Sequence, residues 1–165
     1  MPDWNEIVGA NAANVLNTAY RVLGNLADAE DVSQEVFAQA FAKWRTAPEQ
    51  QWAGILRRMS VCRSIDLLRV KKSPQPLMID VADGVENSPH EAAVCREIEQ
   101  RLRQAVGDLP DRESQVFCLM YFEQQSHHEI AQALGIKRSA VATSLSKARS
   151  KLQTLFREIP TGDSK

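Results

Sequence analysis

The C-terminal third of the chain carries a pattern that restricts it to two short helices meeting at a tight corner. Ser126 and Glu129 have the spacing of a capping box, in which each side chain accepts a hydrogen bond from the other residue's backbone amide at the start of a helix. Gly135 allows the left-handed turn that ends this helix. Residues 139–156 then repeat apolar residues at steps of four and three, which predicts a second amphipathic helix. Two helices joined by a four-residue turn containing glycine form the helix-turn-helix pattern.

Charge patterning suggests what this corner contacts. The 165-residue chain has a net charge of -1, yet residues 57–72 and residues 124–157 each hold six basic side chains and one acidic side chain. Two basic blocks on a nearly neutral chain favour two distinct polyanion contacts over a general attraction to polyanions. A plain helical hairpin and two solvated helix faces are the alternatives, and we favour DNA binding.

The rest of the chain also has helical periodicity, and no segment shows the alternation typical of a strand. Gly24 supplies one turn, and the residues before Pro48 end another helix because proline disfavours helical geometry in the residue before it. The predicted fold class is therefore all-α. We expect helices over about 5–23, 28–45, 51–72, 89–106 and 111–122.

The predicted helix over 51–72 differs from the others because its apolar residues form two stripes. Trp52, Leu56 and Met59 belong to one stripe. Val61 and Ile65 belong to the other. A helix with two apolar stripes is expected to pack against more than one neighbour.

Turn-forming composition divides the chain into two small helical domains. Residues 73–89 combine proline, serine, glycine and acidic residues, which predicts a flexible linker. We therefore expect domains over residues 1–72 and 90–157, followed by a short tail over 158–165.

Composition excludes several classes of protein. The chain is 44% hydrophobic and 25% charged, as expected for a folded globular protein. No apolar run approaches the roughly 18 residues of a membrane span, and the N-terminus lacks the features of a signal peptide. The three cysteines form no CxxC pair, which suits a reducing compartment. We expect a cytoplasmic protein without membrane insertion.

The sequence also gives no indication of catalysis. It contains no P-loop, no Rossmann glycine pattern and no nucleophile motif. His127 and His128 are adjacent, but with the distant His90 and Cys95 they do not have the spacing of a zinc ligand set. We expect no enzyme activity, no metal and no cofactor.

Four motifs in order carry a resemblance to a known family. They are DAEDVSQEVF at 28–37, IDLLR at 65–69, LPDRE at 109–113 and EIAQALGI at 129–136. These resemble the D-A-E-D-x-x-Q-E-x-F and I-D-x-L-R stretches of region two and the L-P-x-R-x and E-I-A-x-x-L-G-I stretches of region four in sigma-70 family sigma factors. The order and the intervening linker resemble the compact extracytoplasmic-function (ECF) group.

The resemblance implies a dissociable subunit that brings bacterial RNA polymerase core to chosen promoters and starts transcription. Region two would dock on the polymerase clamp and open the minus-ten element. Region four would bind the minus-thirty-five element and the polymerase flap. The group also implies an anti-sigma factor as a partner.

The resemblance and the helical pattern together assign a polymerase contact. Asp31, Gln34 and Glu35 lie opposite the apolar stripe of the predicted helix over 28–45, where their acceptors suit basic residues of a partner. A solvated acidic face is the alternative. The residues assigned to core-polymerase binding are Asp28, Asp31, Gln34, Glu35 and Phe37.

DNA contacts are assigned in the same way. The resemblance places a flipped-base pocket at the loop over 46–51, and the basic residues after it suit backbone phosphates. Trp44 and Trp52 flank this loop, and we expect both in the core rather than stacked on a base. The residues assigned to the minus-ten element are Thr46, Pro48, Gln51, Arg57, Arg58, Arg63, Asp66, Arg69, Lys71 and Lys72.

The predicted recognition helix departs from the family pattern. Ala142 and Ser144 stand where the family usually has lysine and arginine, so hydroxyl groups must make weaker base contacts there. The residues assigned to the minus-thirty-five element are Lys137, Arg138, Ser139, Ala142, Thr143, Ser146 and Lys147.

Two other functions stay open at this point. One is a free-standing helix-turn-helix transcriptional regulator in which residues 1–72 serve dimerisation or sensing. The other is a sigma-like adaptor that has lost promoter binding, as the substitutions at Ala142 and Ser144 suggest.

Overall fold

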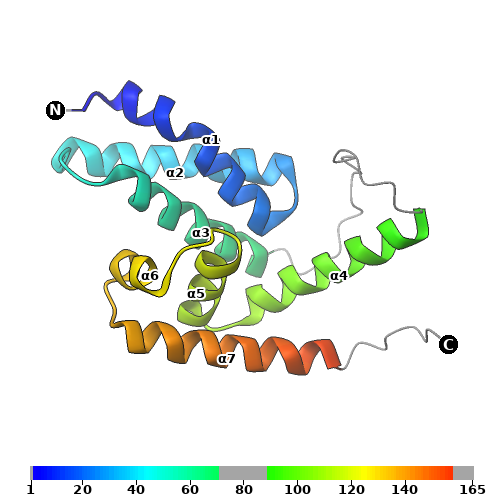
Figure 1. Ribbon diagram of the computed structural model, residues 1–165. Helices are drawn as coiled ribbons and strands as arrows, with labels where there is room; N and C mark the ends of the chain where they lie inside the picture. The colour runs from blue at the N-terminus through cyan, green and yellow to red at the C-terminus, as the bar shows by residue number, and fades with distance from the viewer. Residues whose placement is uncertain (1, 71–88, 158–165) are drawn as a thin grey trace.

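A computed structural model describes residues 2–70 and 89–157, and every regular element in them is a helix. The all-α prediction is therefore confirmed (Figure 1). Residues 71–88 and 158–165 lie outside the described residues, and so do Lys71, Lys72, most of the predicted linker and the predicted tail. No described helix is long and apolar enough to cross a membrane. The helices are α1 (Trp4–Leu23), α2 (Leu26–Thr46), α3 (Trp52–Val70), α4 (Pro89–Asp108), α5 (Asp111–Tyr121), α6 (His127–Leu134) and α7 (Arg138–Arg157).

Helices α1, α2 and α3 pack around one apolar cluster. Val15 from α1, Val32 from α2 and Leu56 from α3 are almost fully buried in it. Gly24 ends α1 with a φ of 69°, a left-handed conformation that glycine adopts without steric cost. The Asn25 side chain then caps α2 by accepting a hydrogen bond from the Asp28 backbone amide. The two helices are thus joined by a turn of only two residues.

The predicted corner between α6 and α7 forms as the sequence indicates. The Ser126 hydroxyl accepts from the Glu129 amide at 3.2 Å, and the Glu129 carboxylate accepts from the Ser126 amide at 2.8 Å. Gly135 ends α6 with a φ of 65°. Ile130 and Val141, one from each helix, are fully buried. The capping box and the left-handed glycine are confirmed.

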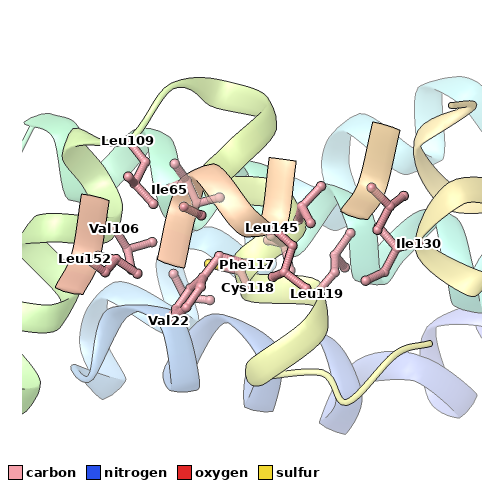
Figure 2. Close-up of a cluster of buried hydrophobic side chains, with 14 of the residues drawn as sticks. Val22, Ile65, Val106, Leu109, Phe117, Cys118, Leu119, Ile130, Leu145 and Leu152 are labelled. Carbon is pink, nitrogen blue, oxygen red and sulfur yellow. The ribbon is translucent and has the colours of Figure 1, made fainter. Parts of the chain in front are cut away.

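Helix α3 lies between the two halves of the molecule. Trp52 and Leu56 belong to the cluster that α1 and α2 share, as the first predicted stripe requires. Val61 and Ile65 belong to a second cluster, which α4, α5, α6 and α7 build. Figure 2 shows Ile65 and Val22 packed among side chains of the C-terminal helices. The prediction that this helix has more than one neighbour is confirmed, and the two halves share a core.

Candidate polymerase and nucleic-acid interfaces

The polar side of α2 forms an acidic ridge, which we define as Asp31, Gln34 and Glu35. All three residues are exposed, whereas Val32 and Val36 on the opposite side are buried. The helical period produces this separation, because residues three and four apart share a face. Several carboxylate and amide oxygens therefore face solvent along one line, as a basic protein partner would require.

One member of the acidic ridge already has a basic partner. The Glu35 carboxylate accepts a hydrogen bond from the Arg63 guanidinium of α3. This hydrogen bond and the negative charge of Glu35 raise the pKa of Arg63. Both side chains are close to half exposed, so solvent screens the pair and a partner can compete for it.

The two remaining residues assigned to polymerase binding have roles in the fold. Asp28 is half-buried in the first turn of α2, where its backbone amide takes part in the cap. Phe37 packs edge-on against Trp4, with 6.3 Å between ring centroids. Phe37 therefore supports the α1–α2 contact, and only the acidic ridge of the assigned set is exposed.

The loop between α2 and α3 is held at both ends. The Thr46 hydroxyl donates to the Lys43 carbonyl at 3.0 Å. The indole nitrogen of Trp52 donates to the Pro48 carbonyl at 3.0 Å, and the Trp52 ring is buried. Gln51 is exposed at the end of the loop. Trp52 is thus a core residue, as expected, and it also fixes the loop.

Trp44 is the second tryptophan beside this loop. It is half-buried, and its ring stacks on Phe41 with a centroid distance of 5.7 Å and an interplanar angle of 21°. Its indole nitrogen donates to the Pro2 carbonyl at 3.3 Å. Its ring also lies 5.8 Å from the ring of Trp4 in α1, so Trp44 belongs to the α1–α2 contact.

Three of the residues assigned to the minus-ten element share one hollow between α2 and α3. Arg58, Arg63 and Asp66 line it, and its volume is about 280 Å³. Gln39 and Lys43 from α2 complete the polar lining. Sequence reasoning missed these two, although their spacing of four places them on one polar side of α2.

Cys62 also lines this hollow. Burial raises the pKa of the Cys62 thiol, and the positive charge of Arg58 partly offsets that rise. The side chain therefore stays a neutral thiol at neutral pH, a weak hydrogen-bond partner for a base.

Two other arginines assigned to the minus-ten element turn away from the hollow. Arg57 lies 3.2 Å from the Glu123 carboxylate, which belongs to the segment after α5. Arg69 donates to the carbonyls of Gly107, in the last turn of α4, and Leu109, which follows α4. The structure therefore divides the four described arginines of the predicted set into one pair at the hollow and one pair at the contact between the two halves.

The residues assigned to the minus-thirty-five element gather on one side of α7. Ser139, Ala142, Thr143 and Ser146 have the spacing of a single helix face. The Thr143 hydroxyl donates to the Ser139 carbonyl at 2.9 Å, which leaves its oxygen available as an acceptor. All seven assigned residues are exposed: Lys137, Arg138, Ser139, Ala142, Thr143, Ser146 and Lys147.

Other basic residues of α7 serve the fold. Arg149 donates to the Tyr121 hydroxyl and lies 5.4 Å from the centre of the Tyr121 ring. Lys151 donates to both oxygens of Glu113, at 2.8 and 3.0 Å. These residues hold α7 against α5, so charge counting alone overstates the basic surface offered to DNA.

The described part of the chain contains no cluster of three or more histidine, cysteine or acidic side chains suited to a metal ion. Cys118 is fully buried, and burial strongly raises the pKa of its thiol. It packs as a small apolar residue.

Comparison with known families decides between the possible identities. Residues 7–72 match the family described as "Sigma-70 region 2". Residues 99–152 match the family described as "Sigma-70, region 4". Both regions occur in one chain and in this order. The chain belongs to the sigma-70 family.

The curated relatives of this sigma-70 chain confirm the resemblance to the ECF group. It is 29% identical over 168 residues to the ECF RNA polymerase sigma factor SigW of Bacillus subtilis, covering 93% of this chain and 89% of that protein. It is 27% identical over 157 residues to the ECF RNA polymerase sigma factor SigE of Mycolicibacterium smegmatis, covering 93% of this chain but only 61% of that protein.

Solved structures share the fold of this sigma-70 chain. The structure of CnrH in complex with the cytosolic domain of CnrY superimposes with a TM-score of 0.61 and 21% identity, covering 93% of this chain and 87% of CnrH. The extracytoplasmic function sigma factor SigJ of Mycobacterium tuberculosis superimposes with a TM-score of 0.53 and 23% identity, covering 87% of this chain and 51% of that one. Region two corresponds to α1, α2 and α3, and region four to the helices from the second half of α4 to α7.

Proposed function

We propose that this chain is an ECF-type sigma factor, which directs RNA polymerase core to specific promoters and starts transcription. The observation that carries the proposal is the presence of both sigma-70 regions in one chain, each with its exposed contact surface. A free-standing helix-turn-helix regulator would use α6 and α7 in the same way, but it would have no need for the acidic ridge of region two.

The acidic ridge of α2 is the proposed polymerase contact. Its oxygens can accept charge-assisted hydrogen bonds from basic side chains of the clamp. Glu35 would exchange Arg63 for such a partner. This exchange would release Arg63 next to the hollow, where the minus-ten strand is proposed to bind.

Region two is the proposed site of strand opening. Extruding a base costs a few kcal/mol in lost stacking and pairing, and a protein recovers this by holding the base and the single-stranded backbone. The loop held by Trp52 and the neighbouring hollow with Lys43, Arg58 and Arg63 supply these two kinds of contact.

Region four is the proposed reader of the minus-thirty-five element. The exposed face of α7 enters the major groove in this arrangement, with Lys137 and Arg138 at its N-terminal end. The central part of this face presents hydroxyl and methyl groups. Promoter discrimination is therefore proposed to lie mainly in the minus-ten element.

The proposed role requires no catalytic group, metal or cofactor of the chain's own, and it places the chain in the cytoplasm with the polymerase. An anti-sigma factor is the proposed regulatory partner. The fold that the chain shares with CnrH, which was solved bound to the cytosolic domain of CnrY, supports such a partner.

Reconstituted transcription tests the proposal. Purified chain and core polymerase are mixed with a library of promoter fragments, and the run-off products are sequenced. A separate pull-down with core polymerase measures whether the chain binds it. Specific transcripts that require the chain support the proposal. DNA binding by the chain without any association with core would instead show a free-standing regulator.

A further inference from the structure

The exposed face of α7 carries short, methyl-bearing side chains at its centre, and we define Ala142 and Thr143 as the methyl pair. Both residues are exposed. On the core-facing side of the helix, Val141, Leu145 and Ala148 are each 2% exposed or less. Helix α7 runs along an outer edge of the molecule, with α4, α5 and α6 packed on one side of it (Figure 1). The methyl pair therefore faces outward on a helix whose orientation is fixed by its core contacts.

A hydrogen bond within the helix restricts the chemistry that Thr143 offers. Its hydroxyl donates to the Ser139 carbonyl at 2.9 Å. A hydroxyl group has one hydrogen and two acceptor lone pairs, so Thr143 offers a partner a methyl group and an oxygen that can only accept. The hydrogen bond and the branched side chain also limit rotation about the first side-chain torsion. Ala142 has no such torsion, so the methyl pair loses little conformational entropy when it contacts DNA.

The major-groove edges of the bases differ in how well they suit this chemistry. Guanine presents two acceptors, N7 and O6, which need donors that the methyl pair does not offer. Thymine presents its C5-methyl group, for which alanine and the methyl group of threonine are the usual apolar contacts. The adenine paired with that thymine presents its N6 amino group, which can donate to the Thr143 oxygen. The methyl pair therefore suits an A·T pair and does not suit a guanine.

Basic residues flank the methyl pair on both sides along the helix. Lys137 and Arg138 are exposed at the N-terminal end of α7, and Lys147 is exposed one turn after Thr143. Contacts to phosphates fix the register and orientation of a protein on the duplex but carry no sequence information. Because the side chains of the methyl pair are short, the helix can approach the base edges closely between these contacts.

The geometry points to a methyl readout, in which the methyl pair recognises the C5-methyl group of thymine in the minus-thirty-five element. The inference rests on the proposed function and names the base that the centre of α7 recognises. Burying one methyl group changes affinity by about fourfold. A bidentate contact to guanine discriminates more strongly. Thymine readout therefore adds selectivity upstream and leaves the minus-ten element as the main source of discrimination.

Removing only the C5-methyl group from the DNA tests the inference. The full-length chain, bound to core polymerase and in parallel on its own, selects duplexes from a library with a randomised upstream window. The selected duplex is then synthesised with uracil in place of each thymine in turn, and electrophoretic mobility shift measures the affinities. We expect the wild type to enrich thymine in the window and to bind thymine about fourfold more tightly than uracil at the contacted positions.

Variants at Thr143 separate the methyl group from the hydroxyl group. Thr143→Ser keeps the hydroxyl and should lose the preference for thymine over uracil at the position that Thr143 contacts. Thr143→Val keeps a methyl group and should preserve that preference. Thr154→Ser is the matched control, because Thr154 is exposed on α7 and its hydroxyl also donates to a carbonyl four residues earlier, that of Ser150, at 3.0 Å. Thr154 lies about 16 Å further along the helix, so this variant should behave as wild type does.

Three results would overturn the inference. They are an upstream window in which no thymine is enriched, equal binding of thymine and uracil duplexes by the wild type, and an unchanged preference in both Thr143→Ser and Ala142→Gly. The third result would show that the shape of the DNA is read instead of the methyl group. Run-off transcription from the selected duplexes tests the proposed function separately. If the wild type binds them but starts no transcript with core polymerase, the proposed function fails, while the comparison of thymine with uracil still decides the base readout.

Discussion

Arginine side chains in this chain have two distinct uses, and their hydrogen-bond partners distinguish them. Arg58 and Arg63 line an open hollow, and Arg63 is paired with a half-exposed carboxylate. Arg69 donates to backbone carbonyls, which cannot move away independently of the fold. Sequence reasoning placed all three in one DNA-binding set, because residue type and spacing do not show which acceptors a guanidinium will meet.

At the residue scale, we predict that reversing two charges of the acidic ridge weakens binding to core polymerase and leaves the stability of the fold nearly unchanged. Asp31→Lys with Glu35→Lys should weaken binding to core polymerase at least tenfold, because charge pairs across an interface contribute well over 1 kcal/mol. Stability should change little, since an exposed pair such as Glu35 with Arg63 contributes about 0–1 kcal/mol.

Fluorescence anisotropy with labelled chain measures the affinity, and thermal unfolding measures the stability. Glu6→Lys, an exposed charge reversal on α1, is the control and should bind core normally. Unchanged affinity in the double variant would remove the ridge from the polymerase contact.

A second prediction at this scale concerns the capping box of α6. Ser126→Ala should lower the free energy of unfolding by about 1 kcal/mol, because the Glu129 backbone amide at the start of the helix loses its acceptor. Helix α6 has only eight residues and little other local support. Urea unfolding measures the loss. Ser150→Ala, at an exposed position inside α7, is the control and should be neutral or slightly stabilising. Equal losses in both variants would contradict a specific capping contribution.

At the scale of elements, the sequence predicted the helices well because each depends on local signals. Apolar period, glycine turns and caps lie within a few residues of one another, and the seven helices within residues 2–70 and 89–157 match expected segments. The two stripes of α3 also predicted two neighbours. What the sequence lacked was the identity of distant partners: nothing local shows that Lys151 meets Glu113 or that Arg149 meets Tyr121. These pairings depend on the angle between helices, which the sequence pattern does not specify.

The geometry of α7 leads to a prediction about its two departures from the family pattern. Ala142 is exposed on the same face as Ser139 and Ser146, whereas Ser144 is half-buried beside the buried positions Val141 and Leu145. Ala142→Lys should therefore strengthen binding to the minus-thirty-five element several-fold and steepen its salt dependence, since a new phosphate contact releases counterions.

Ser144→Arg should give a smaller gain at some cost in stability, because its stem starts next to the core. Electrophoretic mobility shift at several salt concentrations measures both effects on promoter fragments bound with core polymerase. Asn14→Lys, which adds the same charge at an exposed position on α1, controls for added charge alone. A larger gain from Ser144→Arg than from Ala142→Lys would show that a different face of α7 meets DNA.

At the scale of the whole molecule, one of the two apolar clusters of this sigma-70 chain spans both regions. Val22 and Ile65 of region two are buried with Val106 and Phe117 of region four. Such a cluster couples the stabilities of the regions, because separating them exposes apolar surface at a cost of roughly 25 cal/mol per Å². The ion pairs around Glu123 give the contact its specificity. The sequence indicated two domains and a linker, but contacts between residues so far apart in the chain leave no periodic signal.

The last prediction follows from this coupling. Cleavage by a glutamyl endopeptidase within residues 73–88, which contain Glu86, should yield two fragments that remain associated. They should elute together in gel filtration and stay together at high salt, since salt screens exposed charges but does not weaken apolar contacts. The same cleavage in the Glu123→Lys variant should release separate fragments, because the buried site would then hold three cations. Glu97→Lys, cleaved in parallel, should behave as wild type does. Separate elution of the wild-type fragments would mean that only the covalent connection keeps the regions together. The shared apolar cluster would then contribute too little free energy to hold the two fragments in one complex.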